Sequence, residues 1–408
     1  MSISMSMKSV LLAGVLAAGT AAAVGMNLVA ERSDPTLINP VSVTPLEQPT
    51  DQNLVQPKVE VVFVLDTTSS MSGLIDAAKN NIWSIASSMA SADPEPDMRM
   101  GLVAFRDRGD DYITRVLDLS QDLDSMYVSL SNFRAQGGGD GPESVNAALH
   151  AAVNNVSWSQ DNHTYKVIFL VGDAPPHMDY ADEPQYPEII RQAKAKGIVV
   201  NCIQAGNQNN TRKVWQQIAS LNQGEFFRVE QSGSAVEVTT PFDDQIAKLS
   251  RDLDETKLFY GSEEKRQRLQ AKEKASRDLF ASVPAAIQAK RAEYNSKAAG
   301  VDNLFADSEL VEDVASGKVE LDALPAKSLP EPLLGLDKAE QKKLVEKTAQ
   351  KREQIQAEIA ELGKQRQAYI ADQLKEEEVA QSLDGKIYEA IRSQASSKGL
   401  NYESGPSF

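Results

Sequence analysis

The sequence is poor in several residue types, and each scarcity excludes a class of protein. Its 408 residues include one cysteine, Cys202, and three histidines. A single cysteine rules out an intrachain disulfide and a cysteine-based zinc cluster. Basic residues are outnumbered, with 42 Lys and Arg against 58 Asp and Glu, which gives a net charge of −16. We expect no nucleic-acid partner, because a basic surface supplies most of the affinity for phosphate backbones.

Common catalytic motifs are missing as well. The chain has no G-x-S-x-G nucleophile turn, no H-E-x-x-H zinc motif and no phosphate-binding loop with its lysine. Clustered carboxylates could support metal-assisted hydrolysis, but no histidine or lysine is placed by the sequence to act as the base. We therefore expect a protein that is not an enzyme.

The N-terminus has the pattern of an export signal. Residues 9–30 form an almost uncharged apolar run behind Lys8, and residues 21–23, all alanine, offer a cleavage site. The run is also long enough to cross a bilayer if it is not removed, so a membrane anchor is the alternative. Residues 31–57, rich in Pro, Asp, Gln and Thr, indicate a linker. We expect an exported protein that is periplasmic, in the cell envelope or secreted, including an inner-membrane-anchored form.

Residues 58–261 alternate apolar strands with amphipathic helices. This alternation predicts an α/β domain with a doubly wound, mostly parallel sheet. The expected strands are 59–66, 98–107, 112–120, 165–173, 198–206 and 225–230. The expected helices are 72–91, 143–156, 187–196, 211–221 and 241–253. In such sheets, ligands bind at the carboxyl ends of the strands.

Residues 262–398 show no strand pattern. Their Ala, Glu, Lys, Gln and Arg content favours helix, above all over 262–298 and 337–380. Apolar spacings near three and four within 337–380 indicate a long helical hairpin or a partial coiled coil, although Gly363 and several charges interrupt the heptad. Residues 399–408 are expected to form a flexible tail.

Three segments place oxygen-bearing side chains after predicted strands. Asp66, Thr68 and Ser70 form a D-x-T-x-S pattern, Asp140 lies in a glycine-rich stretch that opens a helix, and Asp173 ends the strand 165–173. A hard divalent cation such as Mg²⁺ or Mn²⁺ prefers these oxygen donors. The pattern alone is also compatible with a helix N-cap, since Asp, Ser and Thr all cap helices.

These motifs resemble the metal-ion-dependent adhesion site of von Willebrand factor A domains. VLDTTSSMSG, VAFRDRGDD, GGGDGPESVNAAL and FLVGDAPP occur in the family's order, closest to its bacterial and hemicentin-like branch. The resemblance implies a doubly wound sheet over 58–261 and a metal held by Asp66, Thr68, Ser70 and Asp173. Asp140 stands where integrin-type domains carry Thr. A third carboxylate would reduce the positive charge left on the ion, and with it the attraction for an acidic partner.

Other polar residues near these motifs have simpler interpretations. Glu143 is expected to favour a helix N-terminus, His177 to lie in a loop, and Cys202 to be a buried small side chain. The tripeptide that begins at Arg108 is expected to be an ordinary charged turn.

Three functions remain compatible with the sequence. The preferred one is an exported, non-catalytic module that binds a protein partner through a metal site. The alternatives are an adaptor subunit of a larger assembly, as in chelatase-type ATPase complexes, and a structural cell-envelope protein.

Overall fold

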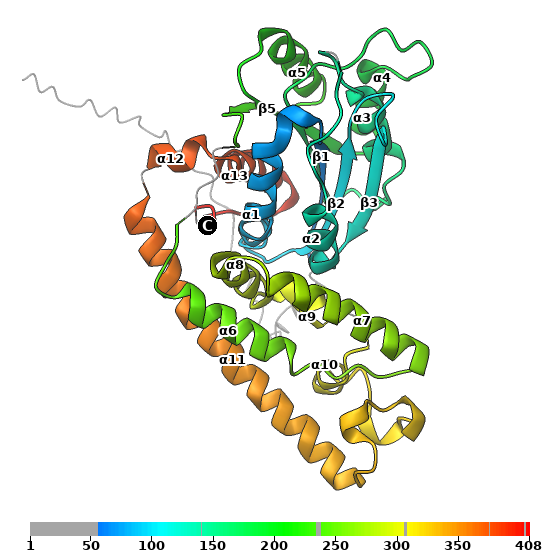
Figure 1. Ribbon diagram of the computed structural model, residues 1–408, viewed down its shortest axis with the longest axis vertical. Helices are drawn as coiled ribbons and strands as arrows, with labels where there is room; N and C mark the ends of the chain where they lie inside the picture. The colour runs from blue at the N-terminus through cyan, green and yellow to red at the C-terminus, as the bar shows by residue number, and fades with distance from the viewer. Residues whose placement is uncertain (1–55, 140, 234–237, 306–307, 375, 404) are drawn as a thin grey trace, which may run out of the picture. The chain divides into compact units, whose positions relative to one another are not determined.

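The computed structural model describes residues 56–408 except 140, 234–237, 306–307, 375 and 404 (Figure 1). The described residues belong to one compact unit. The expected signal or anchor (1–30), and nearly all of the expected linker, lie outside them. Among the described helices, none is long and apolar enough to cross a membrane.

A six-stranded sheet forms the centre of the N-terminal half. Its strands are β1 (Lys58–Asp66), β2 (Asp97–Phe105), β3 (Thr114–Ser120), β4 (Tyr165–Gly172), β5 (Ile198–Ala205) and β6 (Phe226–Val229). Their order is β3-β2-β1-β4-β5-β6, and all neighbours pair in parallel except β2 and β3. The predicted fold class, a doubly wound and mostly parallel sheet followed by a helical region, is confirmed.

Helices cover both faces of this sheet, as its apolar strands require. The helices of this half are α1 (Ser72–Met89), α2 (Leu123–Ser131), α3 (Val145–Asn154), α4 (Tyr186–Ala195) and α5 (Asn209–Leu221). Hydrophobic residues of α1 and α2 share a core with one face, and those of α3, α4 and α5 share a core with the other. Helix α2 was not predicted; Asp122 begins it by accepting a hydrogen bond from the Ser125 amide.

The helical region forms further layers. Its helices are α6 (Asp243–Asp254), α7 (Glu263–Phe280), α8 (Ala285–Asn295), α9 (Val301–Phe305), α10 (Leu310–Ala315), α11 (Lys338–Gln373), α12 (Glu376–Gln381) and α13 (Leu383–Gln394). Pro284 separates α7 from α8, because proline cannot continue a helix from the preceding turn.

Helix α11 is the long helix that the sequence predicts, and its buried side packs within the chain on α6, α8 and α10. Two positions that interrupt the heptad are paired charges. Arg352 binds Glu309 at 2.7 Å and Arg366 binds Asp243 at 2.8 Å. At the third, Gly363, a Cβ would approach the side chain of Glu293 to 3.2 Å. The irregular pattern therefore reflects contacts inside the chain.

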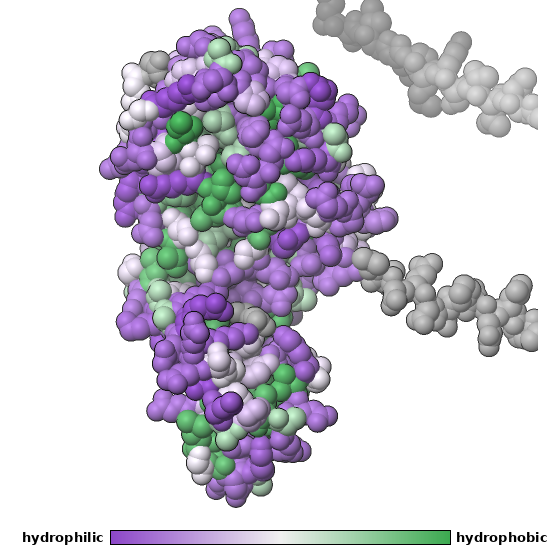
Figure 2. All heavy atoms as spheres, turned by 90° about the vertical axis from the view of Figure 1, so that its right-hand side faces the viewer, coloured by the Kyte–Doolittle hydropathy of each residue, from purple (hydrophilic) through white to green (hydrophobic). Residues whose placement is uncertain are grey.

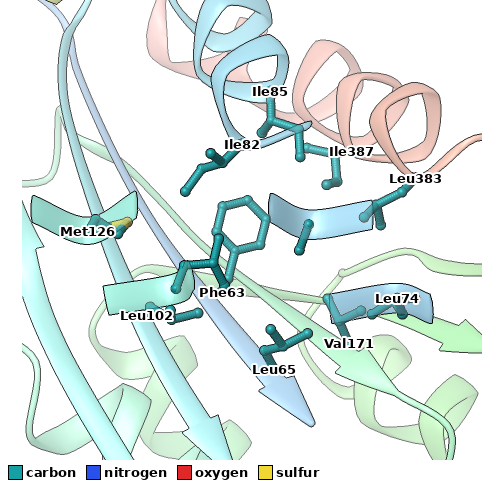
Figure 3. A pocket seen from close by; sticks show the side chains of 12 residues that line it. Phe63, Leu65, Leu74, Ile82, Ile85, Leu102, Met126, Val171, Leu383 and Ile387 are labelled. Carbon is teal, nitrogen blue, oxygen red and sulfur yellow. The ribbon is translucent and has the colours of Figure 1, made fainter. Parts of the chain in front are cut away.

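Helix α13 returns to the sheet and packs beside α1 (Figure 1). Leu383 and Ile387 join the core of the β1–β4 face, where they contact the region around Phe63 (Figure 3). An apolar cavity of about 40 Å³ remains at this junction. At the other end of α13, the Gln394 amide donates to Asn201 at 2.8 Å. A C-terminal helix thus covers a sheet built from the N-terminal half.

The segment after α13 is anchored, in contrast to the flexible tail expected for 399–408. Leu400 is fully buried, and the Tyr402 hydroxyl donates to the carbonyl of Met89 at 2.9 Å. The Phe408 carbonyl accepts a hydrogen bond from Arg366. The sequence did not reveal this, because the apolar residues here are too few for a periodic pattern. The predicted domain boundary near Gly261 remains a prediction, since it concerns whether residues 58–261 and 262–398 fold independently.

Candidate metal centre

The first predicted loop is built as a hydroxyl-lined turn at the end of β1. Asp66 is fully buried, and its Oδ1 accepts hydrogen bonds from the Thr68 amide at 2.9 Å and the Thr68 hydroxyl at 2.7 Å. The hydroxyls of Thr68 and the exposed Ser70 are 3.5 Å apart. Neither the 3₁₀ turn Ser69–Met71 nor α1 has a side-chain cap. The helix-cap alternative therefore does not account for these residues.

The loop after β4 brings Asp173 to the same edge. Strands β1 and β4 are neighbours, with Leu65 opposite Val171, so Asp66 at the end of β1 and Asp173 just after β4 lie at the same edge. Gly172 permits this approach, because a Cβ there would lie 2.8 Å from the Cβ of Asp66. The Thr211 hydroxyl donates to the Asp173 carbonyl at 2.9 Å and holds the loop.

Gln231, just after β6, links the first and last loops. Its amide nitrogen donates to Asp173 Oδ2 at 2.8 Å and to the Ser70 carbonyl at 3.0 Å. No sequence pattern pointed to this residue, which lies in no recognised motif. Gln231 orients the Asp173 carboxylate and leaves its other oxygen for a ligand.

The surroundings of Asp66 do not fully compensate a negative charge on its carboxylate. Burial raises the pKa of Asp66 to about 7. The hydrogen bonds from Thr68 and the backbone of Asp173 oppose this shift, and the charge of the Asp173 carboxylate adds to it. Asp66 Oδ2 is buried and has no hydrogen-bond partner. A buried carboxylate oxygen of this kind is costly unless a proton or a cation neutralises it.

Glu143 is a site residue that sequence reasoning missed. We expected only a favourable charge at a helix N-terminus, but its side chain is 4% exposed, and its Oε2 has no hydrogen-bond partner. A Cβ on Gly138 would meet both Glu143 Oε1 at 3.0 Å and Thr68 Cβ at 3.2 Å, so only the glycine separates them. Burial, followed by Asp66 and Asp107, raises the pKa of Glu143 to about 9. Its place after the glycine-rich stretch was the available signal.

The turn 107–111 supports the glycine-rich loop. Asp110 Oδ2 accepts hydrogen bonds from the amides of Gly138, at 3.0 Å, and Asp107, at 3.1 Å. Gly137 has φ 78°, and a Cβ there would lie 2.2 Å from Asp110. This close approach explains why glycine is needed. The tripeptide Arg108 to Asp110 thus makes internal contacts, in agreement with the expected charged turn.

His177 joins this turn to the loop after Asp173. Its Nδ1 lies 2.8 Å from Asp179 Oδ1 and its Nε2 lies 3.4 Å from Asp107 Oδ2. The ring stacks on Tyr180 with centroids 4.1 Å apart, and the Tyr180 hydroxyl donates to Asp107. His177 is in a loop, as predicted, but it is buried and structural there.

The structure brings four of the five predicted metal ligands to one edge of the sheet: Asp66, Thr68, Ser70 and Asp173. Asp140 lies outside the described residues. Within the described part of the chain, no three His, Cys, Asp or Glu side chains form a group that could hold an ion. Hydroxyl oxygens would have to complete the set. The unpartnered Asp66 Oδ2, in a loop that also carries the Thr68 and Ser70 hydroxyls, fits a small, oxygen-preferring cation.

Part of the chain is similar to known proteins. Residues 60–240 match the family described as von Willebrand factor A domain. No curated protein matches the chain. Among solved structures, the SpRpn10 VWA domain is 12% identical with a TM-score of 0.34, and the match covers 43% of this chain and 89% of that one.

Two structures of proximal thread matrix protein 1 from the mussel byssus are 16% and 17% identical, both with a TM-score of 0.34. The matches cover 43% and 42% of this chain and 42% of each mussel chain; one of these has a zinc-occupied MIDAS motif. The present chain therefore spans less than half of the mussel protein. Domains of this family commonly mediate protein–protein interaction. Residues 60–240 of this chain match the von Willebrand factor A domain family, which supports a domain of this type over that segment.

Proposed function

We propose that this protein is an exported, non-catalytic module that holds Mg²⁺ or Mn²⁺ and docks a protein partner at the ion. Asp66, Thr68, Ser70 and Asp173 would hold the ion together with Asp140. The observation that carries the proposal is the buried Asp66 Oδ2, which has no hydrogen-bond partner although Oδ1 has two. A bound ion would supply a Lewis-acidic contact point for an oxygen atom of the partner.

The donor set favours a hard cation. The four described ligands offer only carboxylate and hydroxyl oxygens, which suit Mg²⁺ and Mn²⁺ better than a soft metal. Gln231 keeps Asp173 in place through the bond to Oδ2, and the Thr68 amide fixes Asp66. These contacts hold the protein oxygens in position before an ion arrives, which reduces the ordering cost of binding.

Calorimetric titration with Mg²⁺ and Mn²⁺ tests the metal site. Asp66→Ala and Asp173→Ala should abolish binding, whereas Thr68→Ala should weaken it less, because it removes a neutral ligand. Asp278→Ala is the matched control, since Asp278 lies on α7 with 64% of its side chain exposed. Equal heats in wild type and Asp66→Ala would refute the site.

Export and partner binding need separate measurements. Cell fractionation of the full chain and of a chain lacking residues 1–30 should show that only the full chain leaves the cytosol. Capture from an envelope extract should retain a partner with Mg²⁺ and lose it with chelator. Retention that does not depend on chelator would leave a binding module without a metal role.

A further inference from the structure

The loops around the candidate metal centre are strongly acidic. In the segments 66–73, 105–113, 137–146 without 140, 172–185, 206–213 and 230–233, ten carboxyl groups stand against four basic side chains. One divalent cation cannot neutralise this excess. The face would therefore stay negative after the ion binds, and the field of its loops would act on any approaching partner.

Both arginines of the segment 105–113 are already engaged by other groups of the chain. Arg108 binds Asp182 at 2.8 Å and Glu183 at 2.6 Å, and its guanidinium lies 4.0 Å from the centre of the Tyr180 ring. Arg106 is buried, donates to the Arg134 carbonyl at 2.8 Å and lies 3.6 Å from Asp111. An acidic partner would have to compete with these carboxylates for either guanidinium.

Exposed acidic and apolar side chains are close in the chain at two places on this face. We call these four residues the rim: Asp111, Ile113, Met178 and Asp179. The side chains of Asp111 and Asp179 are 76% and 75% exposed. Ile113 and Met178, beside them in the chain, are 37% and 48% exposed and are two of the five large hydrophobic side chains exposed in the described chain. Seen from the β3 side, hydrophilic side chains cover most of the surface, with hydrophobic patches between them (Figure 2).

The buried side chain of Glu143 is a second feature of the same region. Glu143 is 96% buried, and its Oε2 lacks a hydrogen-bond partner although Gly138 and Thr68 lie against the side chain. A buried polar oxygen without a hydrogen-bond partner is expensive, and a ligand that brings a polar or positively charged group to the site relieves that cost. The exposed carboxylates and the buried Glu143 therefore favour the same kind of ligand, one that carries positive charge.

We propose that the partner docks on this face through a segment rich in lysine or arginine, and that an acidic partner is disfavoured. The proposal rests on the proposed partner-binding function. Lysine and arginine combine an aliphatic stem with a charged end, which matches an apolar side chain beside a carboxylate. Charge complementarity at such exposed positions mainly raises the rate of association and the selectivity for the partner.

Two peptide probes test the charge preference on the full chain in Mg²⁺. They are blocked, fluorescently labelled ten-residue peptides of Gly and Ser that carry either three lysines or three glutamates. In low salt, fluorescence anisotropy should show at least ten-fold tighter binding of the lysine peptide. The difference should shrink at high salt, because screening weakens exposed charge pairs.

Substitutions test whether the rim carboxylates bind the lysine peptide. Asp111→Asn combined with Asp179→Asn should weaken the lysine peptide several-fold and leave Mg²⁺ affinity unchanged, whereas Asp278→Asn should alter neither. Tighter binding of the glutamate peptide, or equal affinity for both peptides, would overturn the proposal. Loss of Mg²⁺ binding in Asp66→Ala without any change in lysine-peptide affinity would refute the metal role and leave the charge preference standing.

Discussion

The Ser84 hydroxyl on α1 donates a hydrogen bond to Asp384 Oδ2 on α13 over 2.9 Å, although 300 residues separate them in the sequence. Both residues are buried, and Lys290 on α8 lies near enough to influence the carboxylate. The second oxygen, Oδ1, has no hydrogen-bond partner. This single carboxylate therefore connects the C-terminal helix to the sheet domain, and burial of its charged form costs free energy.

Asp384 should make stability depend on pH. Burial raises its pKa to about 6, above the ordinary 3.8. Its contribution to the free energy of unfolding is therefore fully present below about pH 4 and is lost as pH rises through 6, on the order of 3 kcal/mol. Asp384→Asn should remove that dependence and be more stable than wild type at pH 7. Denaturant titrations of both proteins from pH 4 to 8 measure the difference, and a constant difference would contradict this assignment.

Removal of the C-terminal segment should destabilise the sheet domain. A chain that ends at residue 381 loses α13 and uncovers apolar side chains on the α1 face, including Phe63 and Val171. We expect a large fall in melting temperature and binding of a hydrophobic dye. A chain that ends at residue 402 keeps Leu400 and Tyr402 and is the control. An unchanged melting temperature in the shorter chain would mean that α13 contributes little.

Filling the cavity below α13 should stabilise the protein. Val171 lines the cavity of about 40 Å³ (Figure 3), and isoleucine adds one methylene while keeping the β-branched side chain that strands prefer. Val171→Ile should raise the free energy of unfolding by about 1 kcal/mol. Val171→Ala enlarges the cavity and should lower it by roughly 2 kcal/mol. Chemical denaturation measures both, and a destabilised isoleucine variant would show that the cavity cannot accept the group.

Glu143 should affect the ion-free protein in the alkaline range. Its pKa is raised to about 9, mainly by burial, so its contribution to stability is fully present below about pH 4.5 and is lost as pH rises through 9. In the presence of chelator, Glu143→Gln should therefore be less sensitive than wild type between pH 8 and 10. Thermal unfolding over that range provides the measurement. Parallel curves for the two proteins would show that Glu143 does not carry a proton in the folded state.

Much of the candidate site could be predicted because its residues directly follow strands. Asp66 and Asp173 end apolar runs whose length and β-branched content indicate buried strands, and parallel strands bring their carboxyl ends to one edge. Glu143 and Gln231 could not be found in this way. A glutamate at the start of a helix and a glutamine in a turn have ordinary local explanations, so only the folded chain shows what surrounds them.

The sequence by itself determined most elements of the sheet domain, since strand and helix periodicity and turn residues act within a few neighbours along the chain. It also predicted the mostly parallel sheet, a long helical segment within 337–380 and the acidity of the loops. Tertiary structure alone decided that α13 covers the sheet, that Arg352 and Arg366 are buried as ion pairs, and that Asp66 keeps an unpartnered oxygen. These outcomes depend on burial and on partners up to 300 residues apart, which no local pattern encodes.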